Sequence, residues 1–179
     1  MDKIASRYAE ALVAIAQDVK RLDEFKAQAK LLSKVFRENP DYVGLFSKPQ
    51  LSIREKHELL DSVLAQRIDP YWLNLLKLMV EKRRAYLLEA VTLDFIHLAN
   101  TAQGIEEGIV YSVYPLSEES LKQLETTYSA QRNTAVELLN KLDPTLISGL
   151  RIRFKESVID LSLSAQLDAL RDTLREGRS

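Results

Sequence analysis

The spacing of apolar residues changes once along this chain of 179 residues, and that change constrains the fold more than any other feature. Up to about residue 104, apolar residues recur three or four positions apart, which is the period of an α-helix. After Gly108 a period of two appears, which is typical of a strand. Gly104 and Gly108 bracket a short acidic segment between the two patterns. We therefore expect an all-helical domain over 1–104, a linker over 105–108 and a second domain over 109–179.

Caps and prolines divide the helical pattern of the first domain into six segments. Asn39-Pro40 and Asp69-Pro70 each place a capping side chain before a proline at the first helical position. Ser52-Ile53-Arg54-Glu55 has the spacing of a capping box. Gly104 supplies a stop for the last of these helices. We expect helices over about 4–19, 22–36, 40–47, 53–64, 70–82 and 84–103, which together form an all-α bundle.

The second domain mixes strands and helices. Apolar and basic residues alternate over 149–155, which predicts a strand with one buried and one wet face. Residues 109–114 and 136–142 are its predicted companion strands, and Ser117 is predicted to cap a helix over 118–132 between them. Leucines at helical spacing predict a final amphipathic helix that contains Leu163, Leu167, Leu170 and Leu174. The expected fold class is α+β and mostly α, a six-helix bundle followed by a small α/β domain.

Composition excludes several classes of protein. The chain has 25 Lys and Arg against 26 Asp and Glu, so its net charge of −1 provides no overall field that would hold a nucleic acid. It has no Cys, which excludes disulfides, thiol nucleophiles and thiolate metal sites. No apolar run is long enough to cross a membrane, and the start Met1-Asp2-Lys3 resembles neither a signal nor a transit peptide. We therefore expect the mature protein to be the whole chain.

Candidate catalytic residues do not converge in the sequence. His57 and His97 have no second ligand at the spacing of a metal site. Asp143-Pro144 and Asp160 are isolated carboxylates near predicted strand ends, where a role in turns is expected. The glycine-rich motifs that bind nucleotide phosphates are absent. We expect no catalytic residue, no cofactor and no metal, and the competing possibility is an enzyme with an unrecognised site.

Two basic clusters are candidates for contact with an acidic partner. One is Lys82-Arg83-Arg84, between two predicted helices. The other lies on one face of a predicted strand and consists of Arg151, Arg153 and Lys155. Each is compatible with an ordinary solvated surface. Each is also compatible with an RNA- or DNA-binding helical factor, whose binding would depend steeply on salt.

Two of the predicted helices have an apolar arc wider than one buried face needs. A helix that faces a single core needs an arc of about 100–140°. Apolar residues cover roughly 180° of the first helix and roughly 220° of the fifth, at about 100° per residue. Such width fits a helix buried at the centre of the bundle, and it equally fits a helix that also lines a groove for another chain. Alanines in the first helix leave shallow spaces in which a partner helix can lie close.

Several segments, in order along the chain, resemble one known family. They are Ala5-Ser6-Arg7-Tyr8-Ala9-Glu10-Ala11-Leu12, Arg83-Arg84, Val113-Tyr114-Pro115-Leu116-Ser117, Leu142-Asp143-Pro144-Thr145-Leu146-Ile147-Ser148-Gly149-Leu150-Arg151-Ile152, Val158-Ile159-Asp160 and Ser162. The chain resembles the delta subunit and oligomycin sensitivity conferral protein family of F-type ATP synthase. The resemblance implies a six-helix N-terminal domain, a small α/β C-terminal domain and a non-catalytic role.

The resemblance also implies partners. Members of this family bind the N-terminal helices of the alpha subunits of the catalytic head and grip the b-type subunits of the peripheral stalk. The head is thereby held still while the rotor turns during proton-driven ATP synthesis. The resemblance implies one copy per complex, no nucleic acid and no direct insertion into the membrane. The expected location is the cytoplasmic face of a bacterial cell membrane, as part of the complex.

These partners can be assigned to residues of this chain as hypotheses. The groove for the alpha-subunit helix is expected between the first and fifth helices, near Tyr8, Leu12, Ile15, Trp72, Leu76 and Met79. The contact with the stalk is expected on the basic strand face and the leucine-rich final helix, at Arg151, Arg153, Lys155, Leu170 and Leu174.

Overall fold

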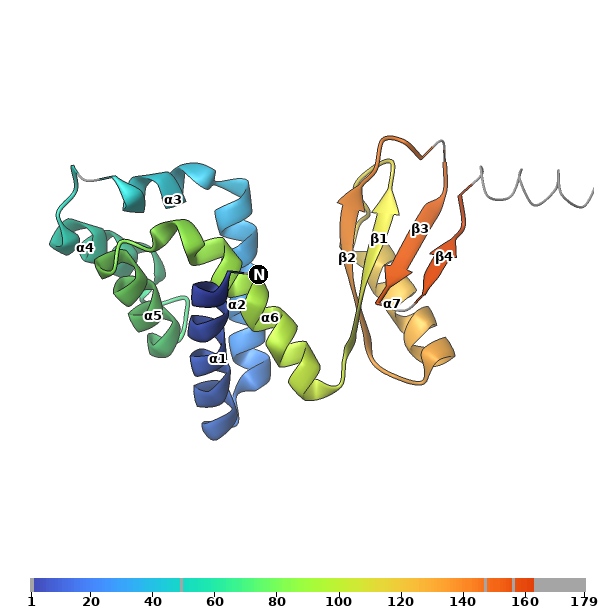
Figure 1. Cartoon of the computed structure of the whole chain (residues 1–179), viewed down its shortest axis with the longest axis horizontal. Helices are drawn as coiled ribbons and strands as arrows, with labels where there is room; N and C mark the ends of the chain where they lie inside the picture. The colour runs from blue at the N-terminus through green and yellow to red at the C-terminus, as the bar shows by residue number, and fades with distance from the viewer. Residues whose placement is uncertain (1, 49, 147, 156, 163–179) are drawn as a thin grey trace, which may run out of the picture. The chain divides into compact units, whose positions relative to one another are not determined.

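A computed structural model describes residues 2–48, 50–146, 148–155 and 157–162 (Figure 1). The chain forms two compact units, Met1–Ala99 and Asn100–Ser179. The structure is mostly helical with one small sheet, which confirms the α+β class. The predicted final helix, with Leu163, Leu167, Leu170 and Leu174, lies outside the described residues.

Helices fill the chain ahead of the sheet. They are α1 (Lys3–Asp18), α2 (Leu22–Glu38), α3 (Pro40–Ser47), α4 (Ile53–Leu64), α5 (Pro70–Glu81), the short 3-10 helix η1 (Ala85–Leu87) and α6 (Leu88–Gln103). The core of the first unit contains large side chains that are almost fully buried, among them Phe25, Leu32, Trp72, Leu76, Met79 and Phe95. Trp72 meets Phe95 edge to face with ring centroids 5.0 Å apart, so α5 and α6 pack against each other through these rings.

The structure confirms one of these predicted helix caps and contradicts another. The capping box at the start of α4 is confirmed, because Glu55 N donates to Ser52 Oγ and Ser52 N donates to Glu55 Oε2. The bond from the Ser52 hydroxyl holds the pKa of Glu55 below its ordinary value. The predicted Asn39 cap on α3 is wrong, because the Asn39 side chain donates to the carbonyl of Val35 at the end of α2. Because Asn39 lies between α2 and α3, its side chain can form a hydrogen bond with the end of one helix or the start of the other.

Helices α1, α5 and α6 end in the same left-handed turn. After α1, Lys20 has a φ of 56° and Arg21 N donates to Ala16 O at 2.9 Å. After α5, Arg83 has a φ of 57° and Arg84 N donates to Met79 O at 2.8 Å. Gly104 closes α6 similarly, with a φ of 67°. In this motif the last free carbonyls of the helix accept bonds from the turn.

The sixth helix begins later than the sequence predicts, because the turn at Arg83 precedes it. The sequence predicts one helix over 84–103, whereas the structure has η1 followed by α6 from Leu88. Arg84 N already donates to Met79 O in the closing turn of α5, so Arg84 is the residue before η1 and not the first turn of α6.

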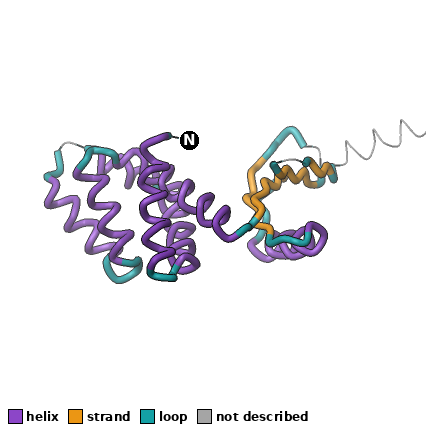
Figure 2. Tube along the Cα trace, turned by 60° about the horizontal axis from the view of Figure 1, so that its bottom comes forward, coloured by secondary structure: helices purple, strands orange, loops and turns teal. Residues whose placement is uncertain are grey.

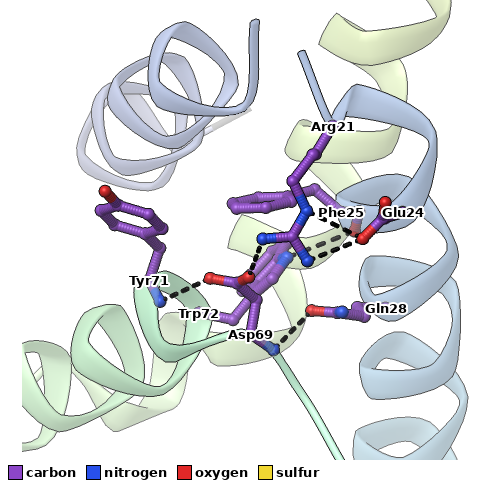
Figure 3. A network of polar contacts seen from close by, with 7 residues as sticks. All are labelled: Arg21, Glu24, Phe25, Gln28, Asp69, Tyr71 and Trp72. Carbon is purple, nitrogen blue, oxygen red and sulfur yellow. Dashed lines mark hydrogen bonds and ion pairs between the residues drawn. The ribbon is translucent and has the colours of Figure 1, made fainter. Parts of the chain in front are cut away.

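A buried carboxylate joins the start of α5 to the end of α1 and to α2 (Figure 3). Asp69 is 5% exposed, and its Oδ1 accepts from Tyr71 N at 2.9 Å as the N-cap of α5. Its Oδ2 accepts from Arg21 Nη1 at 2.7 Å, and its own backbone N donates to Gln28 Oε1 at 2.8 Å. A hydrogen bond to Glu24 and a second to Asp69 raise the pKa of Arg21. The position and direction of α5 are therefore fixed at its first turn.

The second unit is a four-stranded sheet with a helix across one face (Figures 1 and 2). Its elements are β1 (Glu106–Ser112), α7 (Glu118–Arg132), β2 (Val136–Leu142), β3 (Leu150–Phe154) and β4 (Val158–Asp160). The strand order is β2-β1-β3-β4, with β1 and β2 parallel and the other pairs antiparallel. The predicted bounds of α7 and β2 are confirmed, and β4 was not predicted. Tyr128 of α7 packs with the core side chains Val110, Val136, Leu138, Ile152 and Phe154.

The predicted linker over 105–108 is wrong, because β1 begins at Glu106 and pairs with β2 from its first residue. Glu106 accepts two bonds at 2.6 Å from Arg132, the last residue of α7. Gly108 is required by close packing, since a Cβ there would lie 2.7 Å from Leu138 Cδ2 and 2.8 Å from Phe154 Cε1. The acidic residues and the glycine that suggested a linker are thus parts of a strand.

We predict that Asp69→Ala lowers the free energy of unfolding by about 2 kcal/mol, because α5 loses its cap and Arg21 and Tyr71 lose their acceptor. Asp2→Ala is the matched control, since Asp2 caps α1 through Ile4 N on the exposed surface and should lose about 1 kcal/mol or less. Urea denaturation followed by circular dichroism measures both. Equal losses in the two variants would contradict a joining role for Asp69.

We predict that Asp160 titrates far below the ordinary value of 3.8, because hydrogen bonds from Ser162, followed by one from Arg151, hold its pKa at about 2. Its folded pKa lies below its unfolded pKa, so its stabilising effect is complete above about pH 4 and is lost as the pH falls toward about 2. An NMR titration of the side chain measures this. Ser162→Ala should raise the pKa of Asp160 more than Arg151→Gln does, and the reverse order would contradict this assignment of causes.

Candidate functional site

The histidines and carboxylates of the described residues form no group that could hold a metal ion. No set of three or more His, Asp or Glu side chains among these residues is placed to hold a metal ion. His57 Nε2 lies 3.5 Å from Glu81 Oε1, between the half-buried side chain of His57 on α4 and the exposed side chain of Glu81 on α5. Asp143 accepts from the backbone and hydroxyl of Thr145, which keeps the pKa of Asp143 low. Asp143 and Asp160 therefore hold turns, as their positions in the sequence predicted.

A groove of about 590 Å³ lies between α1 and α5, and it is the candidate site of the first unit. Most of its wall is apolar. It is lined by Ile4, Arg7, Tyr8, Ala11, Leu12 and Ile15 on the side of α1, and by Tyr71, Asn74, Leu75, Leu78 and Arg84 on the side of α5. Tyr71 and Leu78 are 45% and 40% exposed, so this side of α5 presents apolar surface to water.

Two arginines hold the walls of the groove together, one at each end. Arg21, just after α1, donates to Asp69, just before α5. Arg84, just after α5, donates to the hydroxyl of Tyr8 in the first half of α1 at 2.6 Å. The end of each helix is therefore bonded to the start of the other, so α1 and α5 run antiparallel. We call these two contacts the arginine clamp.

On α1 the structure places the predicted groove residues as expected. Tyr8 and Ile15 are half-buried in the wall, and Leu12 is buried at 3% exposure. The Tyr8 ring lies under the guanidinium of Arg84, whose central carbon is 5.7 Å from the ring centroid. The exposed Ala11 leaves room beside these residues, which is the shallow space that the sequence predicted.

On α5 the predicted residues are wrong. Trp72, Leu76 and Met79 have exposures of 0%, 1% and 0%, and they belong to the core instead of the groove. Trp72 Nε1 donates to the carbonyl of Phe25 at 3.2 Å inside the bundle. The groove is lined instead by Tyr71, Leu75 and Leu78, and Figure 3 shows the Tyr71 ring directed away from the Asp69 carboxylate.

A signal in the sequence could have found these residues. At about 100° per residue, Trp72, Leu76 and Met79 occupy the middle of the apolar arc of α5. The residues that line the groove lie at one edge of that arc, beside the polar residue Asn74. The middle of a wide arc faces the core of its own bundle, because packing is densest there. The edge is the part that lines the groove.

The basic residues predicted for a stalk contact lie in the second unit with different surroundings. Arg151 is paired with Asp160 at 2.8 Å across β3 and β4. Arg153 and Lys155 are exposed, and Lys155 follows the end of β3. The buried side chains Ile152 and Phe154 alternate with them, which confirms a strand with one buried face. Leu170 and Leu174 lie outside the described residues.

In the basic cluster Lys82-Arg83-Arg84, the two arginines lie in different surroundings. Arg84 turns to Tyr8 in the groove, while Arg83 takes the left-handed position of the turn after α5. Over the part of the chain that the structure describes, none of the helices combines the length and the apolar character needed to cross a membrane.

Comparison with known proteins assigns the chain to a family. The model of the ATP synthase delta (OSCP) subunit family matches residues 4–174. A protein of Halalkalibacterium halodurans named ATP synthase subunit delta is 33% identical over 175 residues, which cover 97% of this chain and 96% of that protein. Proteins of the same name from a Geobacillus strain and a Synechococcus strain are each 33% identical, over 172 and 171 residues.

A solved structure supports the fold. A chain in a cryo-EM structure of the Toxoplasma gondii mitochondrial ATP synthase hexamer superposes with a TM-score of 0.70 at 19% identity. The superposition covers 97% of this chain and 98% of that chain, so the likeness extends over both units. This protein belongs to the ATP synthase delta (OSCP) subunit family, whose members are non-catalytic subunits of the ATP synthase complex.

Proposed function

We propose that this chain is a peripheral-stalk subunit of F-type ATP synthase, in which the groove between α1 and α5 binds the N-terminal helix of an alpha subunit. The single observation that carries this proposal is the partly exposed apolar groove, in a chain of this family. An amphipathic helix is the occupant that such a groove suits, because its apolar face covers Tyr71, Leu75 and Leu78 and its polar face stays in water.

The size of the groove agrees with a long-lived contact. Covering about 300 Å² of apolar surface corresponds to a gross driving force of about 7 kcal/mol, from which the cost of ordering the partner helix is subtracted. The walls are already fixed by the arginine clamp, so little ordering is required of this chain on binding. Slow dissociation is the property that a stator needs, because the head must not turn with the rotor.

The second unit is proposed to hold the b-type subunits of the stalk. Exposed Arg153 and Lys155 on one side of β3 are the described residues that support this contact. The chain thereby links the catalytic head to the stalk as one copy per complex, at the cytoplasmic face of a bacterial membrane. It takes no direct part in proton transport or in the chemistry at the nucleotide sites.

A nucleic-acid-binding function receives no support from the basic clusters. That function requires a continuous cationic surface. Arg151 is paired with Asp160, so one cation of the strand cluster is neutralised, and Arg84 lines the apolar groove with its guanidinium on Tyr8.

We predict that Leu78→Glu weakens binding of the alpha-subunit helix at least tenfold without unfolding the protein, because Leu78 lines the groove and is 40% exposed. The probe is a synthetic peptide of about 20 residues from the N-terminus of the alpha subunit of the same organism, which as a helix spans about 30 Å. Titration calorimetry measures its affinity for the full chain, and circular dichroism checks folding.

Two other substitutions make this test specific. Leu31→Glu is the matched control, since Leu31 is 48% exposed on α2 and does not line the groove. It should bind the peptide as the natural chain does. Leu76→Glu should prevent folding, because Leu76 is buried in the core. Unchanged binding by a folded Leu78→Glu variant would contradict the proposed function.

A further inference from the structure

The groove has a different electrostatic character at its two ends. At the end formed by the start of α5, the cation Arg21 is compensated, because it is paired with Asp69 and Glu24, each at 2.7 Å. At the other end, Arg7 and Arg84 both line the groove. Within the described residues, neither of these two arginines is paired with a carboxylate. One end of an otherwise apolar groove therefore carries two uncompensated positive charges.

Tyr8 holds the guanidinium of Arg84 in place, and most of the N–H donors of that guanidinium remain available for a ligand. Its Nη1 donates to Tyr8 Oη at 2.6 Å and its central carbon lies 5.7 Å from the Tyr8 ring centroid. A guanidinium has five N–H donors, so four remain after the bond to Tyr8. The acceptor is a hydroxyl and not a carboxylate, so this bond does not neutralise the charge of Arg84. A planar donor group fixed beside an apolar wall is suited to bind a carboxylate through two parallel bonds.

We propose that the helix that occupies the groove carries an Asp or Glu at the edge of its apolar face, and that this carboxylate binds Arg84. The proposal rests on the proposed function and names the chemistry of its partner. Arg7, which is exposed on α1 at the same end, adds to the attraction. Because Arg21 at the opposite end is already paired with Asp69 and Glu24, the contact fixes both the register and the direction of the bound helix.

Tyr8 acts in this proposal as a positioning residue. Its ring and its hydroxyl keep the guanidinium of Arg84 at the mouth of the groove, so less side-chain freedom is lost when the carboxylate arrives. Tyr8→Phe retains the ring and removes the hydroxyl, so it separates the hydrogen bond from the apolar contact.

The test is a double-mutant cycle between the full chain and the alpha-subunit peptide described above. Arg84→Gln should weaken binding of the natural peptide about tenfold. A set of peptides, each with one Asp or Glu changed to the corresponding amide, should contain one member that binds the natural chain about tenfold more weakly. That member should lose no further affinity for Arg84→Gln, which identifies the carboxylate that pairs with Arg84.

Further variants separate pairing from general effects. Tyr8→Phe should weaken binding about threefold for the natural peptide and not at all for the peptide that lacks the identified carboxylate. Arg54→Gln is the matched control, because Arg54 is an exposed arginine on α4 outside the groove, and its variant should bind as the natural chain does. Added NaCl should weaken binding of the natural peptide more for the natural chain than for Arg84→Gln.

The outcomes distinguish this inference from the proposed function. Suppose that Leu78→Glu abolishes binding while every amide peptide binds the natural chain as tightly as the natural peptide does. Binding in the groove is then supported, and the carboxylate contact with Arg84 is overturned. A natural peptide without any Asp or Glu would overturn it as well. If Leu78→Glu changes nothing, the proposed function itself fails. The amide peptides are tested on the natural chain, so the result does not depend on the folding of Arg84→Gln.

Discussion

The arginine clamp is the interaction on which the rest of the first unit depends. α1 and α5 face each other across a groove of about 590 Å³. Arg21 on Asp69 and Arg84 on Tyr8 join the two helices, one contact at each end of the groove. Both contacts join the end of one helix to the start of the other. A site for another protein can therefore remain open without loss of order in its walls.

Local signals in the sequence predicted the elements best. Ser52, Asp69 and Ser117 cap helices through bonds to amides two or three residues away, so their effect is readable without knowledge of the fold. Gly108 shows the limit of this approach. A glycine beside acidic residues suggested a linker, whereas its cause is the approach of Leu138 and Phe154 from elsewhere in the second unit. No local pattern contains that information.

The sequence predicted which helices form the groove, but not which residues of α5 line it. A wide apolar arc identified α1 and α5 correctly as its walls. The choice of residues within the arc of α5 failed, because Trp72, Leu76 and Met79 are buried in the bundle. The indole N–H of Trp72 donates there to the carbonyl of Phe25. The family resemblance supplied the partners, which the residues alone left open. Only the coordinates showed that Arg84, read in the sequence as part of a basic cluster, belongs to the groove.

The left-handed turns after α1 and α5 act as spacers of fixed length. Each places its arginine two residues after the C-cap of the helix, which is Val19 for Arg21 and Lys82 for Arg84. One inserted or deleted residue would rotate the guanidinium by about 100° around the helix axis and move it off its acceptor. Substitutions at the turn residues Lys20 and Arg83 leave the number of residues in each turn unchanged. The guanidinium therefore still reaches its acceptor. The clamp therefore depends on the length of these two connections more than on the residue types at Lys20 and Arg83, although surface loops ordinarily tolerate changes in length.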